Sequence, residues 1–167
     1  GYHCVNIGKM HTMPYEADMG FHERFVVENK DRYRGDRWNI DEWDKALRAR
    51  GLAKPSRASY AEWPDWEERL GAYEWPLPAD MHPDNFVGDL ATWWLDYQPE
   101  TVPLFMSIGF PGPHPPYDPV DSYVVPYLAK DLPIQDFSPE EIEAQPATYR
   151  STILMHVRRD QVGPVPP

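Results

Sequence analysis

The stretch from 103 to 119, PLFMSIGFPGPHPPYDP, constrains the fold of this chain more than any other. It begins as an apolar run at 104–110 and then breaks into a proline-rich loop that contains His114. A short apolar run bounded by turn residues is typical of a buried strand, and we expect a central strand of a parallel sheet. Because α/β proteins place binding sites in the loops that follow such strands, His114 is a candidate site residue. The alternative is an ordinary strand exit with a solvated histidine.

A second strand-to-loop transition lies at the start of the sequence. The β-prone run 2–7, YHCVNI, is followed by Gly8, Lys9, Met10 and His11. On an extended backbone Lys9 and His11, two positions apart, point to the same side. Gly8 allows a turn or the close approach of a ligand. Two strand ends would then deliver basic groups to loops, as a site for a small tetrahedral oxyanion requires. The alternative is a surface lysine and a histidine with a structural partner.

Composition favours a sheet covered by long loops over a helical bundle. The chain has 167 residues, of which 41% are hydrophobic, so a single domain with a real core is expected. Its 20 prolines cluster at 76–83, 99–119 and 164–167. We therefore predict an α/β fold with a mostly parallel sheet, flanking helices and long proline-rich loops. The net charge of -11 argues against a nucleic-acid partner, although a local basic pocket can still bind a small anion.

The other elements follow from local signals. Asp41 is a good N-cap for a helix over 41–50, which Gly51 ends. Apolar residues recur at helical spacing over 82–97, where we expect Gly88 to allow close approach of a neighbouring element. No run is long and apolar enough to cross a membrane. Weaker signals indicate a strand at 21–27, a proline-punctuated segment at 123–137, a capping box at Ser138–Glu141, and a last helix over 148–162 with Tyr149, Ile153, Leu154 and Val157 inward.

An irregular insertion rich in tryptophan and proline spans 53–81. Its aromatic side chains could line a substrate pocket or pack the insertion onto the core. We favour packing, since buried aromatic residues usually serve that purpose. The residues in question are Trp63, Trp66, Tyr73 and Trp75.

The two strand motifs together, GYHCVNIGKMH and later FMSIGFPGPHPPYDP, resemble the sulfatase family of the alkaline-phosphatase superfamily. Arylsulfatases, choline-sulfatase-like enzymes and phosphonate monoester hydrolases carry a Gly-Lys-x-His strand and then a Gly-Pro-His-x-Pro strand end, in this order. The segments 19–21, 82–89 and 160–163 also look similar, so the resemblance spans essentially the whole chain. It implies a partial alkaline-phosphatase-like fold, with 1–167 as a single segment of a bacterial-type sulfatase catalytic domain.

The resemblance implies roles for three side chains. Lys9 would contact the sulfate and the nucleophile. His11 would hydrogen-bond the nucleophile's hydroxyl and help to expel sulfate from the covalent intermediate. His114 would bind the sulfate and protonate the leaving oxygen. The substrate class would be a small anionic sulfate ester. In such sulfatases the nucleophile is a formylglycine made from Cys or Ser in a Cys/Ser-x-Pro-x-Arg motif, and a divalent cation, usually calcium, binds the sulfate oxygens.

The sequence departs from the family at the nucleophile and at the metal ligands. Cys4 is followed by Val-Asn-Ile, so it does not lie in the modifiable motif, and as the lone cysteine it is expected to be a buried small hydrophobe without a disulfide partner. The family's metal ligands would fall before Gly1 and after Pro167, so we expect a piece of a longer protein. Asp84 and Asn85 lie where first-turn groups favour a helix dipole, and we interpret them in that way rather than as metal ligands.

Three functions remain open from the sequence. The first is a sulfuric ester hydrolase to which this chain supplies the sulfate contacts while being inactive alone. The second is a non-catalytic α/β fragment with at most weak anion binding. The third is a phosphonate monoester or phosphodiester hydrolase, a relative with the same Lys9, His11 and His114 pattern. Competition between sulfate esters and phosphate diesters would separate the enzyme hypotheses.

Overall fold

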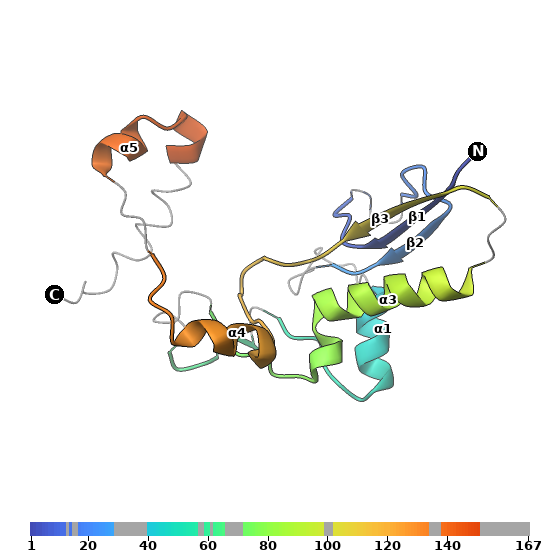
Figure 1. The fold of residues 1–167 in the computed structure, drawn as a ribbon, viewed down its shortest axis with the longest axis horizontal. Coiled ribbons are helices and arrows are strands. Elements are labelled where there is room, and N and C mark those ends of the chain that lie inside the picture. Colours follow the sequence, from blue (N-terminus) through green and yellow to red (C-terminus); the bar gives the residue numbers. More distant parts are fainter. Residues whose placement is uncertain are drawn as a thin grey trace. The chain divides into compact units, whose positions relative to one another are not determined.

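The chain consists of two compact units, 1–128 and 129–167. The elements of the first unit are β1 (His3–Gly8), β2 (Glu23–Val26), α1 (Glu42–Ala49), the 3₁₀ helix η1 (Ala79–Met81), α3 (Pro83–Tyr97), β3 (Leu104–Gly109) and α4 (Asp121–Leu128) (Figure 1). The computed structural model describes residues 1–12, 14, 17–28, 40–56, 59–60, 62–65, 72–98, 102–133 and 138–150.

Three parallel strands form the described sheet in the order β2-β1-β3. The register pairs Val5 of β1 with Glu23 of β2 and with Met106 of β3. The α/β class and the parallel sheet are thus confirmed, and the arrangement is consistent with a partial alkaline-phosphatase-like fold. The prediction that the run at 104–110 is the central strand is wrong for this sheet. β1, which is buried from Val5 to Gly8, takes the centre, whereas β3 pairs on one side among the described residues and leaves Phe105 53% exposed.

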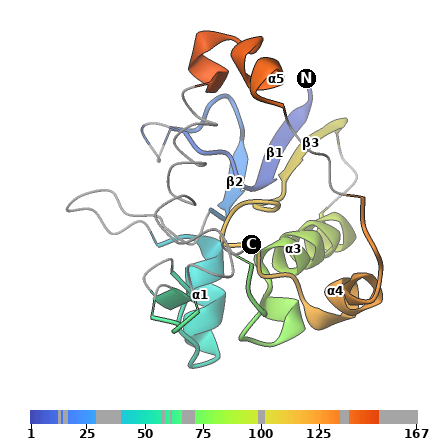
Figure 2. The ribbon, with the colours of Figure 1, turned by 90° about the vertical axis from the view of Figure 1, so that its left-hand side faces the viewer.

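The hydrophobic core lies between β1 and the two helices α1 and α3, which cover the same face of the sheet (Figures 1 and 2). Successive side chains of a strand point to opposite faces, so Val5 and Ile7 face these helices while Cys4 faces away. Cys4 is accordingly only partly buried, and the prediction of a buried cysteine is wrong. The buried core residues are Val5, Ile7, Val27, Trp43, Leu47, Trp75, Met81, Val87, Ala91 and Trp94.

Local capping signals predict the helices well. The Asp41 side chain accepts from the backbone N–H of Asp44, whose own side chain closes a capping box at the start of α1. Gly51 follows this helix with φ of +70°, a conformation that favours glycine. Pro83 occupies the first turn of α3, and the His82 side chain provides its cap. No helix among the described residues has the length and hydropathy needed to cross a bilayer.

The described aromatic residues of the insertion pack against the body of the first unit, as the sequence analysis favoured. Trp75 stacks on Trp43 with ring centroids 6.3 Å apart and belongs to the core. Tyr73 is 5% exposed and lies 4.8 Å from the ring of Tyr60. Trp63 contacts the same two tyrosines, and Trp66 lies outside the described residues. Aromatic packing therefore helps to hold the described part of the insertion.

The segment after His114 contains a helix that the sequence analysis missed. The sequence indicated only a proline-punctuated segment over 123–137, but α4 spans Asp121–Leu128 and contains Pro126. A proline within so short a helix removes one backbone donor near its end, which this helix tolerates. The sequence signal was obscured because the prolines suggested a loop.

Within the second unit, α5 (Pro139–Glu143) begins with the predicted capping box between Ser138 and Glu141. Residues 147–150 are helical after Pro146, in agreement with the expected break. Tyr149 is 65% exposed, so its predicted inward position is wrong within this unit. The remaining positions of the predicted last helix, Ile153, Leu154 and Val157 among them, lie outside the described residues.

Gly88 lies inside α3, and replacing it with alanine is expected to stabilise the fold. A Cβ built at this position meets nothing within 4 Å, so the expected close approach of a neighbour is wrong. Alanine lowers the backbone entropy of the unfolded chain and raises helix propensity, which adds about 0.5–1 kcal/mol to the unfolding free energy. Urea unfolding of Gly88→Ala checks this, and a loss of stability would show that α3 packs more closely here.

Glu23 at the start of β2 gives stability that depends on pH. His3 Nε2 donates to its carboxylate over 2.7 Å, and Trp94 Nε1 donates over 3.2 Å. The hydrogen bond from His3 is the main reason that the pKa of Glu23 lies below its usual value of 4.5. Because the pKa of Glu23 is lower in the folded state, the ionised carboxylate stabilises the fold above pH 4.5. This contribution is lost as the pH falls through the folded-state pKa. The stability difference between wild type and Glu23→Gln should therefore shrink below pH 4.5 in urea titrations; a difference independent of pH would contradict this.

Candidate functional site

The C-terminal ends of β1 and β3 lie in contact, and the motif-bearing loops start there. The register pairs Gly8 with Gly109, and the backbone N–H of Lys9 donates to the Gly109 carbonyl over 2.7 Å. A Cβ on Gly109 would lie 2.1 Å from the Lys9 carbonyl oxygen. Gly8 has φ of +101°, and its Cβ would lie 2.0 Å from the Gly109 oxygen. Both glycines thus allow the two chains to leave the sheet at one point.

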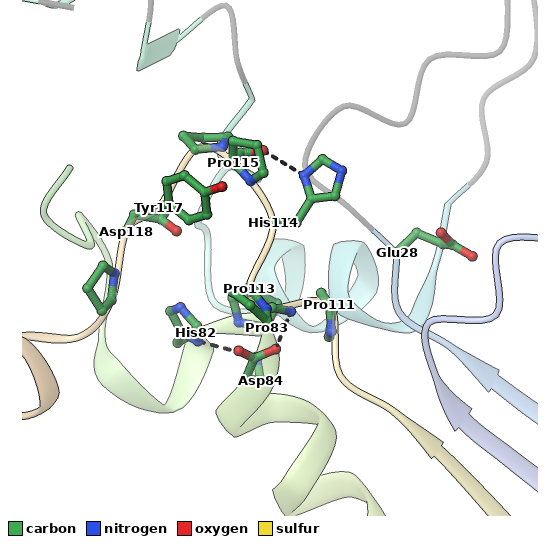
Figure 3. A pocket seen from close by; sticks show the side chains of 13 residues that line it. Glu28, His82, Pro83, Asp84, Pro111, Pro113, His114, Pro115, Tyr117 and Asp118 are labelled. Carbon is green, nitrogen blue, oxygen red and sulfur yellow. Dashed lines mark hydrogen bonds between the residues drawn. The ribbon is translucent and has the colours of Figure 1, made fainter. Parts of the chain in front are cut away.

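A cavity of about 430 Å³ lies beside the loop that follows β3 (Figure 3). His114 and Glu28 both line it, whereas Lys9 and His11 are not among its lining residues. In the view of Figure 3 the His114 ring lies between Tyr117 and Glu28. The lining consists of Glu28, His82, Pro83, Asp84, Pro111, Gly112, Pro113, His114, Pro115, Pro116, Tyr117, Asp118 and Pro119.

Glu28 connects His11 to this cavity. It follows β2, and one of its carboxylate oxygens accepts the backbone N–H of His11 over 2.7 Å. The other carboxylate oxygen lies 3.1 Å from His11 Nδ1. The Glu28 side chain is 1% exposed and that of His11 is 68% exposed. Of the three predicted site residues, the structure therefore places His114 at the cavity, His11 one contact away through Glu28, and Lys9 at the adjoining strand end.

The partner of each imidazole determines where its proton lies. His114 Nδ1 lies 2.7 Å from the Pro115 carbonyl oxygen, which can only accept a hydrogen bond (Figure 3). Nδ1 of His114 therefore carries hydrogen. Its Nε2 has a lone pair when the ring is neutral and carries a second N–H donor when the ring is protonated. This is the atom that could bind an oxyanion or transfer a proton.

Asp84 joins the start of α3 to the loop that carries His114. Its Oδ1 accepts the backbone N–H of Gly112 over 2.9 Å, and a Cβ on Gly112 would lie 2.3 Å from Oδ2 (Figure 3). Asp84 lies in the first helical turn, as predicted, but its contact with Gly112 was not predicted. The available signal was the lone glycine between Pro111 and Pro113, which indicates a backbone that something approaches closely.

A buried pair anchors the other end of the same loop. The Tyr60 hydroxyl donates to the Asp118 carboxylate, and both residues are at most 4% exposed. Burial, followed by this carboxylate, raises the pKa of the Tyr60 hydroxyl strongly. Nearby, the backbone N–H of Tyr73 donates to the Tyr117 carbonyl over 2.7 Å. The insertion thus fixes the loop after His114, which no local sequence pattern indicates.

The described residues do not fit a resident metal ion. Among them, no group of three or more His, Cys, Asp and Glu side chains is arranged to hold one. The cavity carboxylates of Glu28, Asp84 and Asp118 each have a hydrogen-bond partner already. No catalytic step through a metal is therefore assigned to these residues.

Comparison with known proteins supports a distant relationship. No family model matches the chain. The chain is 27% identical over 142 residues to a protein named arylsulfatase from Clostridium perfringens (strain 13 / Type A). The match covers 80% of this chain but only 29% of the length of that relative. This similarity supports a sulfatase-like relationship for the chain.

Proposed function

We propose that this chain supplies the sulfate-contacting side chains of a sulfuric ester hydrolase of the arylsulfatase type. The observation that carries the proposal is the hydrogen bond from the Lys9 N–H to the Gly109 carbonyl. It joins the C-terminal ends of β1 and β3, so both motif-bearing loops leave the sheet at the same place. The distant similarity to an arylsulfatase points to the same chemistry. The proposed substrate is a small anionic sulfate ester.

Lys9 and His114 are the proposed sulfate-binding residues. No carboxylate in the described part of the chain pairs with the Lys9 ammonium, so its donors remain for an anion. His114 donates from Nδ1 to Pro115, and its protonated Nε2 would donate to a sulfate oxygen. The same Nε2 proton can pass to the leaving oxygen as the ester bond breaks. Loss of one such donor costs roughly 10²–10³ in rate in well-studied enzymes.

His11 is proposed to act on the covalent intermediate. Its Nδ1 faces Glu28, so Nε2 is the atom that could accept a proton from the nucleophile's hydroxyl and thereby help to expel sulfate. In the complete enzyme we propose a formylglycine nucleophile and a divalent cation, with calcium expected from the resemblance. Neither is supplied by the described residues, so we propose that the chain alone does not hydrolyse the ester.

Titration of the chain with inorganic sulfate tests the proposal. We expect binding, detected by calorimetry against chloride at matched ionic strength, that weakens about tenfold or more in Lys9→Ala and in His114→Ala, since hydrogen bonds to charged groups are strong. Lys45→Ala is the matched control because Lys45 pairs with Glu42 on the surface of α1, 2.6 Å away. Equal loss in all three variants, or no binding by wild type, would contradict the proposal.

Competition distinguishes the related hydrolases. 4-Nitrophenyl sulfate should displace inorganic sulfate more effectively than a phosphate diester or a phosphonate monoester of the same phenol. Preference for either phosphorus ester would instead favour the phosphonate monoester or phosphodiester hydrolase hypothesis.

A further inference from the structure

Four of the five histidines in the first unit use Nδ1 in a hydrogen bond, and they fall into two groups by its role, whereas His3 uses Nε2. His22 Nδ1 accepts the backbone N–H of Cys4 over 2.9 Å. His82 Nδ1 accepts the backbone N–H of Asp84 over 3.3 Å. A nitrogen that accepts a hydrogen bond carries no proton, so the hydrogen of each neutral ring lies on Nε2. Both histidines serve the backbone, His22 between strands and His82 at the start of α3.

The two histidines proposed for the site show the opposite arrangement. His114 Nδ1 faces the Pro115 carbonyl at 2.7 Å, and His11 Nδ1 faces the Glu28 carboxylate at 3.1 Å. Carbonyl and ionised carboxylate oxygens only accept, so both rings carry hydrogen on Nδ1. In each case Nε2 is left for a ligand.

We propose that Glu28 is the positioning residue of His11: it fixes the Nδ1–H tautomer and so leaves the lone pair of Nε2 to accept the proton of the proposed nucleophile's hydroxyl. This inference rests on the proposed function for the partner of Nε2, but the tautomer is a property of the chain itself. One carboxylate holds both the backbone N–H and the ring of His11, at 2.7 and 3.1 Å. His11 has φ of +55°, a left-handed conformation uncommon for residues other than glycine, and the two contacts with Glu28 stabilise it there.

The pair differs from an ordinary surface ion pair. Exposed pairs contribute little because both long side chains must be ordered from solvent. Here the Glu28 side chain is 1% exposed, and its backbone N–H donates to the Asp41 carboxylate over 2.9 Å. Glu28 also lines the cavity that contains His114. A fixed carboxylate beside an exposed imidazole is the arrangement that orients a histidine for proton transfer.

Nitrogen-15 NMR of the histidine side chains tests the assignment directly. At a pH where the rings are neutral, wild type should show Nδ1–H for His11 and for His114. Glu28→Gln keeps the shape but offers an amide donor to His11 Nδ1, so His11 should change to the Nε2–H tautomer.

The control is Glu23→Gln, which changes a second histidine–carboxylate pair, the one between His3 of β1 and Glu23 of β2. His3 uses Nε2 to contact Glu23, so this variant should leave the His11 tautomer unchanged. An Nε2–H tautomer of His11 in wild type, or an unchanged Nδ1–H tautomer in Glu28→Gln, would overturn the inference. If Glu28→Gln does not fold, the wild-type spectrum still decides. Failure of wild type to bind sulfate, with the Nδ1–H tautomer present, would refute the proposed function but not the role of Glu28.

Discussion

Replacing Gly109 with alanine is expected to destabilise the fold by about 3 kcal/mol or more, in the range caused by overpacking and strain at special backbone positions. The new Cβ would lie 2.1 Å from the Lys9 carbonyl oxygen and 3.0 Å from its carbon. These are backbone atoms of the neighbouring strand, so no side chain can rotate away. Relief requires β1 and β3 to separate where the Lys9 N–H donates to the Gly109 carbonyl.

Gly88→Ala provides the matched control for this prediction, because the same methyl group is added where nothing lies within 4 Å. Urea unfolding should show the two substitutions changing the unfolding free energy in opposite directions. A loss below about 1 kcal/mol in Gly109→Ala, the typical cost of a point substitution, would mean that the strand ends separate easily. The contact between the two motif-bearing loops would then be too weak to build a site.

The parts of the fold that were predicted from sequence are those set by local rules. Asp41, Ser138 and Pro83 mark helix starts because capping and a fixed φ act within one turn. The strand at 104–110 was recognisable from its apolar run, but its place in the sheet was not. Strand order depends on which segments pair, and a hydrophobic run has the same appearance at the centre and at the edge.

In the candidate site, too, residues marked by local sequence were predicted and those that act on distant partners were not. Lys9, His11 and His114 were selected because they follow strands and match a family pattern, and their roles stay predictions. Glu28, Asp84 and Asp118 were missed because each acts on a partner far along the chain: Glu28 on His11 across 17 positions, Asp84 on Gly112 across 28. Spacing along one strand or helix carries no information about such contacts. A tautomer depends on these partners, so it too is visible only in three dimensions.

Asp41→Ala is expected to cost about 3–5 kcal/mol of unfolding free energy, the range found when one partner of a buried ion pair is removed. The Asp41 side chain is 0% exposed and its Oδ2 lies 3.0 Å from Lys54 Nζ. The same carboxylate caps α1 through Asp44 N–H and accepts the backbone N–H of Glu28. The substitution therefore removes a helix cap and leaves the Glu28 N–H without its acceptor, while Lys54 Nζ keeps only Asp44 Oδ2, 3.2 Å away.

Two further variants test whether burial of the Asp41 carboxylate is the reason for the large loss of unfolding free energy. Asp80→Ala removes an ion pair of similar length, 2.6 Å to Arg50, in which both side chains are about half exposed, and should cost less than about 1 kcal/mol. Asp41→Asn keeps an N-cap acceptor but loses the charge, so its cost should fall between these values. Equal costs for Asp41→Ala and Asp80→Ala would show that the Asp41 network adds nothing beyond a surface pair. If the network does hold Glu28, Asp41→Asn should also weaken the preference of His11 for Nδ1–H, because the backbone N–H of Glu28 would lose its carboxylate acceptor and the residue that orients the ring would be held less firmly.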